Sequence, residues 1–169
     1  MDKIELDSGK VSGLGFSSRL SIFKKFNDQL LTFYGKYISV GTHTFRHAHG
    51  YNNFVQRGLP LGWEYGSDGY IIAIGVNYHN ADNLIIKSSL GKLLVGSSRI
   101  TINQYEPFYN DYKSGPFPSG NFKNNYIFNI KLNYRYDKKN NIYISYETFN
   151  NIDSLRRNIF NIGFQKYLF

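Results

Sequence analysis

Residues 126–136 read Tyr126-Ile127-Phe128-Asn129-Ile130-Lys131-Leu132-Asn133-Tyr134-Arg135-Tyr136, with an apolar or aromatic side chain at every second position. Side chains two residues apart share one face of a β-strand, whereas an α-helix would distribute them around its axis. Residues 70–78 alternate in the same way, with Ile72, Ile74 and Val76 between two tyrosines. Both segments are therefore predicted to be strands with one apolar face.

Weaker alternation of the same kind predicts further strands along the whole chain. The expected strands are residues 12–24, 28–42, 69–80, 84–95, 124–136, 141–150 and 156–169, and residues 1–7 are expected to end an eighth. These lengths exceed the usual five or six residues of globular strands and match the ~9–11 residues with which a tilted strand crosses a bilayer. Residues 1–169 are expected to form one all-β domain.

The connections between the expected strands alternate between short and long. Residues 25–27, 80–83 and 137–140 are short and rich in Asn, Asp and Lys, whereas 43–68 and 96–123 are long and contain Gly and Pro. Short turns at one end and long loops at the other are typical of transmembrane β-barrels, whose long loops lie outside the cell. The predicted fold is an antiparallel transmembrane β-barrel of seven to eight strands, interpreted as the C-terminal part of a larger barrel. The alternative is a soluble β-sandwich, whose inner faces carry the same alternation.

The composition is consistent with an outer-membrane barrel. Aromatic residues make up 18% of the chain, with Tyr 15 and Phe 14, and such residues favour strands. Cys 0 excludes disulfides, cysteine catalysis and Cys-ligated metals, and no cofactor is expected. The first seven residues lack the apolar core of a secretory signal, so the export signal of a bacterial outer-membrane protein is expected upstream.

The chain ends in Tyr167-Leu168-Phe169, which resembles the terminal strand read by the barrel-assembly machinery of the outer membrane. The alternate positions counted back from Phe169 depart from that pattern, because Gln165, Gly163 and Asn161 are not apolar. Tyr167 and Phe169 are the predicted assembly signal, and the machinery is a predicted partner.

The loop strings Tyr51-Asn52-Asn53-Phe54, Gly58-Leu59-Pro60-Leu61-Gly62 and Gly66-Ser67-Asp68 lead directly into the strand at residue 70. Together with Phe117-Pro118-Ser119-Gly120 before a later strand, they resemble the Wzi-type capsule-assembly family of outer-membrane proteins. The resemblance covers about residues 45–80 and 115–136. It implies a large outer-membrane barrel that acts without catalysis, as a lectin-like surface, in the assembly or retention of surface polysaccharide.

The loop at 43–68 combines cationic donors with flat apolar rings, a pairing that suits acidic sugars. The predicted glycan-binding residues are Arg46, His47, His49, Arg57, Trp63 and Tyr65. Two other uses of this region stay open: a metal site formed by His43, His47, His49 and Asp68, and a hydrolase site formed by Ser67 and Asp68 with His47 or His79. Trp63 could equally be an anchor at the membrane interface.

Basic side chains within the expected strands should face the barrel interior, because a mid-bilayer Lys or Arg facing lipid costs about 2–4 kcal/mol. The predicted lumen residues are Arg19, Lys36, Lys131 and Arg135. With a formal net charge of +8, they favour an acidic surface polysaccharide or a phosphorylated lipid headgroup as partner. An anion-preferring porin and a barrel enzyme that modifies lipid A are the alternatives, and nucleic acid is disfavoured.

Overall fold

The computed structural model describes residues 13–45, 55–57, 59–80, 83–100, 116–137, 140–150 and 156–166. Its strands are β1 (Gly15–Phe26), β2 (Gln29–Val40), β3 (Val55–Gln56), β4 (Leu59–Pro60), β5 (Gly69–Asn80), β6 (Leu84–Val95), β7 (Lys123–Arg135), β8 (Asn140–Asn150) and β9 (Arg156–Lys166). The seven long strands lie where the alternation predicts them, with ends that differ by no more than three residues. The eighth strand expected at residues 1–7 lies outside the described residues.

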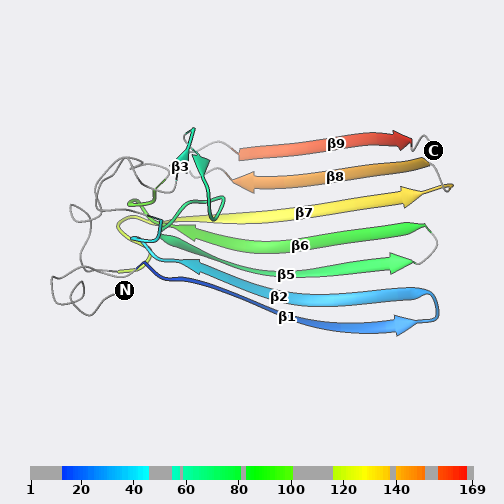
Figure 1. The fold of residues 1–169 in the computed structure, drawn as a ribbon, viewed down its shortest axis with the longest axis horizontal. Helices are drawn as coiled ribbons and strands as arrows, with labels where there is room; N and C mark the ends of the chain where they lie inside the picture. The colour runs from blue at the N-terminus through cyan, green and yellow to red at the C-terminus, as the bar shows by residue number, and fades with distance from the viewer. Residues whose placement is uncertain are drawn as a thin grey trace. The chain divides into compact units, whose positions relative to one another are not determined.

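The seven long strands form one antiparallel sheet in the order β1-β2-β5-β6-β7-β8-β9 (Figure 1). Each long strand therefore pairs with its neighbour in the chain, as in a meander of hairpins. Among the described strands, β1 and β9 lie at the two edges and the sheet is open between them. The all-β antiparallel prediction is confirmed, whereas closure into a barrel is not seen.

The short connections are built from polar turn residues. Asn27 adopts a positive φ of 48° between β1 and β2, a conformation that asparagine tolerates better than most residues. This turn lies at residues 27–28 rather than at the predicted 25–27, because β1 continues to Phe26. Between β7 and β8, the Asp137 carboxylate accepts a 2.8 Å hydrogen bond from the Asn140 backbone N–H. Both turns lie at the end of the sheet where the sequence predicts the short connections (Figure 1).

The long connection at 43–68 contains a small hairpin that the alternation does not predict. β3 pairs antiparallel with β4, with Val55 opposite Pro60 and Gln56 opposite Leu59. Arg57 adopts a positive φ of 51° directly after β3. Strands of two residues carry too few positions for a period of two to be recognised, and for this reason the sequence misses them.

The chain divides into two compact units, each built from several segments. Unit 1 comprises Met1–Ser17, Ile38–Ile71 and Leu93–Asn124, and unit 2 comprises Ser18–Tyr37, Ile72–Lys92 and Asn125–Phe169. Unit 1 holds most of the buried apolar side chains, which are Val40, Ile71, Leu93, Leu94, Val95 and Ile100.

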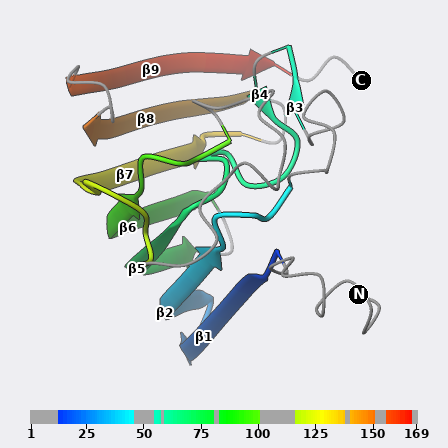
Figure 2. The same ribbon diagram turned by 90° about the vertical axis from the view of Figure 1, so that its left-hand side faces the viewer.

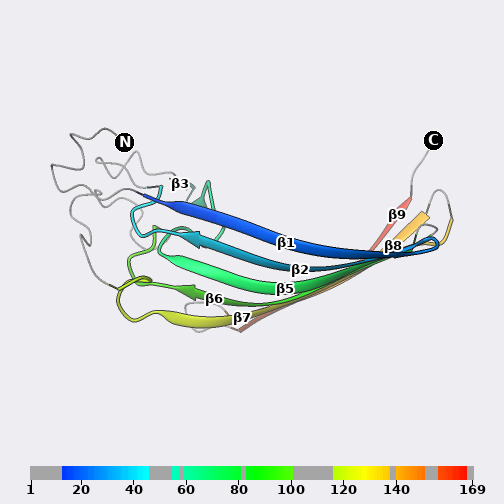
Figure 3. The ribbon, with the colours of Figure 1, turned by 90° about the horizontal axis from the view of Figure 1, so that it is seen from below.

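Unit 2 is built almost entirely from the long strands, and many of its large apolar side chains are exposed. The described residues contain no helix, so no described helix covers these strands (Figure 2). The view from below shows the strands of the sheet running side by side (Figure 3). A sheet normally buries its apolar face against another layer of the protein. In the part of the chain that the structure describes, the apolar side chains of unit 2 therefore lack such a layer.

Candidate functional site

The register of β7, β8 and β9 gathers apolar side chains on one face of unit 2. Ile130 lies opposite Tyr146, which lies opposite Phe160, and Leu132 lies opposite Ile144, which lies opposite Ile162. Residues opposite each other in a ladder share a face, and so do residues two apart in a strand. This apolar face contains Phe128, Ile130, Leu132, Tyr134, Ile142, Ile144, Tyr146, Phe160, Ile162 and Phe164. Ile162 is 65% exposed and Phe160 is 62% exposed, so the face is uncovered.

The other face of the same three strands is predominantly polar. Lys131 lies opposite Ser145, which lies opposite Asn161, and Arg135 lies opposite Asn141, which lies opposite Gln165. In these two rows, polar side chains lie opposite polar side chains across all three strands. The two faces predicted for residues 126–136 are confirmed, and they extend in register to β8 and β9.

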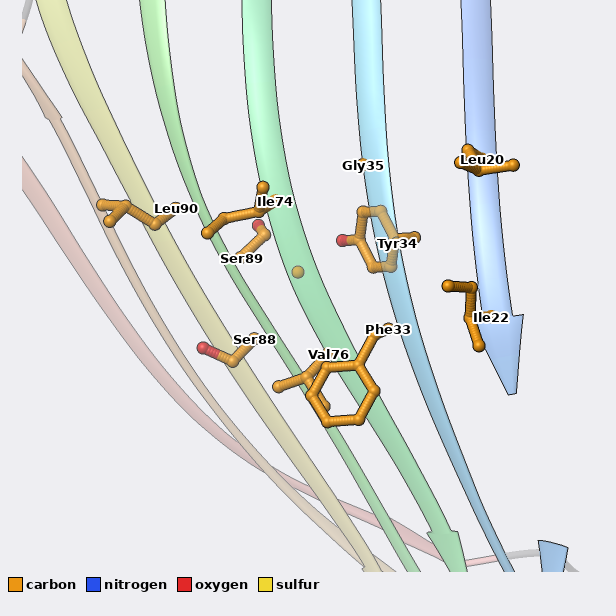
Figure 4. Close-up of a pocket in the computed structure, with 11 residues that line it drawn as sticks. Leu20, Ile22, Phe33, Tyr34, Gly35, Ile74, Val76, Ser88, Ser89 and Leu90 are labelled. Carbon is orange, nitrogen blue, oxygen red and sulfur yellow. The ribbon is translucent and has the colours of Figure 1, made fainter. Parts of the chain in front are cut away.

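The apolar face of β1, β2, β5 and β6 carries an open groove of about 540 Å³ (Figure 4). Its apolar lining is Leu20, Ile22, Phe33, Ile74, Val76 and Leu90. Leu20 is 75% exposed and Ile74 is 66% exposed. Exposed apolar patches on proteins are commonly sites of contact with another protein, a membrane or a ligand.

The opposite face of β1, β2 and β5 carries a stack of side chains. The ring of Tyr34 lies over Gly75, where a Cβ atom would fall only 2.5 Å from the Tyr34 hydroxyl oxygen. The guanidinium carbon of Arg19 lies 3.9 Å from the centre of the same ring, within the range of a cation–π interaction. Arg19 Nε also donates a hydrogen bond of 3.2 Å to Ser21 Oγ. Sequence reasoning selected Arg19 but missed Tyr34, since the alternation does not show which side chains meet across strands.

The other predicted lumen residues also lie on this second face, which we call the polar face. Lys36 follows Tyr34 by two residues on β2, and Lys131 and Arg135 lie opposite Ser145 and Asn141. Glu147 is the single acidic residue within the described strands. The described part of the chain shows no ion pair for Arg19, Lys36, Lys131 or Arg135. The polar face is therefore a cationic surface.

The predicted glycan site in the loop at 43–68 is described in part. Trp63 and Tyr65 form an edge-to-face pair, with ring centres 5.1 Å apart and planes at 78°. Both side chains are half-buried, and Arg57 is exposed on the hairpin. Arg46, His47 and His49 lie outside the described residues, as do the predicted assembly-signal residues Tyr167 and Phe169. The structure thus brings two of the predicted glycan-binding residues together.

Asp68 forms the centre of a buried hydrogen-bond network in unit 1. Its Oδ1 accepts hydrogen bonds from Thr42 Oγ1 at 2.8 Å and from the Ser119 backbone N–H at 2.9 Å. Its Oδ2 accepts a bond from the Ser98 backbone N–H at 3.1 Å and another from Ser119 Oγ. These donors occupy the roughly four acceptor positions of a carboxylate. Asp68 is fully buried and adopts a positive φ of 60°.

The network occupies the side-chain groups that the hydrolase and metal alternatives would need. Ser67 is fully buried, and its hydroxyl oxygen accepts a 3.0 Å hydrogen bond from the Ile100 backbone N–H. A nucleophile must reach a substrate, and a carboxylate that ligates a metal or orients a base needs an acceptor position for that purpose. Ser67 and Asp68 instead link the segment directly before β5 to three other connections. These are the segment after β2 at Thr42, the segment after β6 at Ser98 and Ile100, and the segment before β7 at Ser119. Sequence reasoning missed Thr42 and Ser119, which complete this network.

No group of three or more metal-ligating side chains gathers within the described ranges. Those ranges also contain no helix that is long and apolar enough to span a membrane. Comparisons with known proteins found no matching family model, no matching curated protein and no matching solved structure.

Proposed function

We propose that this chain is a membrane-embedded β-sheet protein of the outer-membrane barrel class that engages acidic surface polysaccharide without catalysis. The apolar face of unit 2 lies against lipid acyl chains in this proposal. The polar face lines a water-filled interior, and the long loops face outward. Because lipid does not satisfy open sheet edges, the proposal requires β1 and β9 to be paired in the membrane.

The observation that carries the membrane role is the sorting of side chains in register across β7, β8 and β9. A soluble sandwich also alternates, but its apolar face is covered by a second sheet. Here Phe160, Ile162 and Phe164 are each at least 60% exposed. Outer-membrane barrels present this arrangement, with apolar residues toward lipid and polar residues toward the interior.

The dimensions of the strands support the same role. A strand of 12 residues such as β5 spans ~40 Å at ~3.3 Å per residue, and a tilt of ~40° leaves ~30 Å across the membrane. This value equals the thickness of the hydrocarbon core. The stacked pair of Tyr136 and Phe164, with ring centres 6.3 Å apart, lies at the short-turn end, where an aromatic girdle is expected.

The polysaccharide role rests on the resemblance to the Wzi-type family and on two features of the structure. The polar face is cationic, and the loop at 43–68 holds both the aromatic pair Trp63–Tyr65 and an exposed Arg57. Guanidinium groups bind carboxylates with paired hydrogen bonds, and aromatic faces cover the apolar side of sugar rings. The cations of the polar face equally favour a second function, an anion-preferring porin.

Site-directed spin labelling tests the membrane role directly. The chain contains no cysteine, so each single-cysteine variant carries one label. Cysteine is placed in turn at Phe160, Ile162 and Phe164, and at the matched positions Asn161 and Gln165 on the other face of β9. The variants are reconstituted in phospholipid vesicles. Labels at the first three positions should be accessible to oxygen, which concentrates in lipid, and labels at the other two to a water-soluble nickel chelate.

Equal accessibility of both sets to the nickel chelate would show that the apolar face is not in lipid, and the proposal would be wrong. The polysaccharide role is tested separately by conductance and binding. A channel that conducts ions in planar bilayers without binding acidic polysaccharide would establish the porin instead.

A further inference from the structure

The hairpin of β1 and β2 places two cations directly opposite each other. β1 ends at Phe26 and β2 begins at Gln29, so the connecting turn has two residues. At the far end of the hairpin, the Gly41 backbone N–H donates a 2.8 Å hydrogen bond to the Leu14 carbonyl oxygen. Phe26 thus lies opposite Gln29 at the turn, and Leu14 lies opposite Gly41 at the far end. Both pairs give the same register, in which each step back along β1 is matched by one step forward along β2. Arg19 therefore lies opposite Lys36.

Like charges opposite each other destabilise a pair of strands, so this arrangement needs an explanation. Arg19 and Lys36 make no ion pair in the described part of the chain, and the one acidic residue of the described strands, Glu147, lies on β8. β1 and β8 are separated in the sheet by β2, β5, β6 and β7. No acidic residue of the described strands is therefore placed to neutralise the pair.

Two contacts orient the Arg19 side chain. One face of its guanidinium group lies on the Tyr34 ring at 3.9 Å, and Nε donates to Ser21 Oγ at 3.2 Å. The ring can lie in this position because residue 75 is glycine. A guanidinium group fixed by its Nε and one face still presents its terminal N–H groups, which match the two oxygens of a carboxylate. Ordering the arginine before binding reduces the entropy lost on binding.

We propose that Arg19 and Lys36 form an anion-binding site on the polar face, and that its ligand is the carboxylate of an acidic sugar. Arg19 donates paired hydrogen bonds to the carboxylate, Lys36 supplies the second positive charge, and Tyr34 is a positioning residue. The anion removes the repulsion between the two cations. The inference deepens the proposed function, since it names the ligand group and two residues that bind it.

The test is a calorimetric titration of the folded full chain, in detergent micelles at low salt, with oligogalacturonate. Neutral dextran oligomers of the same length are the ligand control. Arg19→Gln and Lys36→Gln should each weaken oligogalacturonate binding about tenfold or more, the loss expected when a charge-assisted hydrogen bond is removed. Tyr34→Leu should weaken binding less, and Arg19→Lys should restore part of the affinity that Arg19→Gln loses.

Lys24→Gln is the matched control. Lys24 lies on β1 with its ammonium group over the Phe26 ring, 4.7 Å from the ring centre. Because residues two apart in a strand share a face, Lys24 lies with Leu20 and Ile22 on the apolar face. Lys24→Gln removes one positive charge from β1, as Arg19→Gln does. The affinity of the Lys24→Gln variant for oligogalacturonate should stay within about twofold of that of the unmodified chain.

A second measurement keeps the test decisive if one variant folds poorly. Without ligand at low salt, Lys36→Gln should raise the unfolding midpoint, because it removes the repulsion with Arg19. Oligogalacturonate should raise the midpoint of the unmodified chain more than that of the variant.

Unchanged affinity in both Arg19→Gln and Lys36→Gln, or no binding by the unmodified chain, would overturn the proposal. Displacement of oligogalacturonate by inorganic phosphate at equal charge concentration would overturn the assignment to a sugar carboxylate. The spin labels on β9 report the membrane role independently, so failure of one proposal is distinguishable from failure of the other.

Discussion

Tyr143 lies directly opposite Gly163 in the ladder between β8 and β9, and its ring occupies the space that a side chain at residue 163 would fill. The same relationship joins Tyr34 to Gly75 across β2 and β5. In both pairs an aromatic ring covers backbone that glycine leaves bare, which is a known way of fixing register in curved sheets. Both rings lie on the polar face, so aromatic residues there serve packing between strands.

The Tyr143–Gly163 pair predicts a coupled effect on stability. Tyr143→Ala should lower the free energy of unfolding by about 1 kcal/mol, as expected for a cross-strand aromatic contact. Gly163→Ala should also destabilise, because the added methyl group displaces the ring. Once the ring is gone, the second change should cost little, so the double variant should be less destabilised than the sum of the two. Urea denaturation of all four proteins measures this coupling.

Gly15→Ala is the control for the glycine substitution. A Cβ atom at Gly15 meets nothing within 4 Å, and the residue also lies in a strand. Its stability should be unchanged or slightly raised, since alanine restricts the unfolded chain more than glycine does. Strict additivity at Tyr143 and Gly163 would contradict the proposed contact.

The two faces of β7 predict opposite responses to the same substitution. Ile130→Arg places a charge on the apolar face and should cost about 2–4 kcal/mol if that face lies in the bilayer core. Asn133→Arg places it on the polar face, which the same proposal puts in water, and should be tolerated. The fraction of folded chain in vesicles at increasing urea concentration gives both values. Equal tolerance of the two variants would argue against a lipid-facing surface.

The Asp68 network predicts a severe effect from a change at a single buried residue. Asp68→Ala removes the acceptor of Thr42 Oγ1 and of the Ser119 backbone N–H, and it places alanine at a positive φ. It also removes one of the two acceptors of the Ser98 backbone N–H, which keeps its 3.0 Å bond to Ser119 Oγ. Each buried donor left without an acceptor costs about 1–3 kcal/mol, so the loop connections of unit 1 should unfold. Hydrogen exchange of the Ser98 and Ser119 amides should report the loss.

Two comparison variants separate the causes in this network. Asp68→Asn keeps an oxygen acceptor and a side chain that tolerates positive φ, and it should destabilise less than Asp68→Ala. Ser97→Ala removes a long bond of 3.5 Å from an exposed residue and should have little effect. Equal stability of Asp68→Ala and Ser97→Ala would show that the network does not hold the loops.

The same network leaves no room for a side chain at residue 96, which is glycine. A Cβ atom at residue 96 would fall 2.5 Å from the Ser119 backbone nitrogen and would overlap the Asp68 carboxylate. Because backbone cannot move aside as a side-chain tip can, Gly96→Ala should destabilise by about 1–3 kcal/mol. Thermal unfolding beside the Gly15→Ala control measures it, and a midpoint equal to that of the control would contradict the packing.

Trp63 allows a direct optical test of the loop site, because it is the single tryptophan of the chain. If the Trp63–Tyr65 pair binds sugar, oligogalacturonate should change the tryptophan fluorescence, and the change should weaken with salt. If Trp63 is instead a membrane anchor, brominated lipids should quench it and the oligosaccharide should not affect it.

The polysaccharide role of the loop also predicts an effect in cells. Arg57→Ala and Trp63→Ala should each reduce capsule retention without lowering the amount of folded protein. Phe122→Ala is the control, since it removes another aromatic ring of unit 1 that is 50% exposed. Normal capsule in a protein carrying both loop changes would exclude this loop as the glycan site.

The sequence by itself determined the seven long strands, their antiparallel order and the two faces of β7. Alternation compares residues two apart, so it depends on local geometry and is visible at 126–136 without knowledge of any neighbour. Short polar turns then force consecutive strands to be adjacent. Arg19, Lys36, Lys131 and Arg135 could be assigned to the polar face in this way, but their distances from one another could not.

Only the tertiary structure decided which side chains meet. That Arg19 lies opposite Lys36 depends on a turn of two residues, because a shift of one residue would move each side chain to the other face. Asp68 and Ser119 are 51 residues apart, and their hydrogen bonds exist because separate connections close around one carboxylate. Tyr143 covers Gly163 by virtue of the ladder between β8 and β9. Such contacts arise from pairing between distant segments, which no local pattern of residues records.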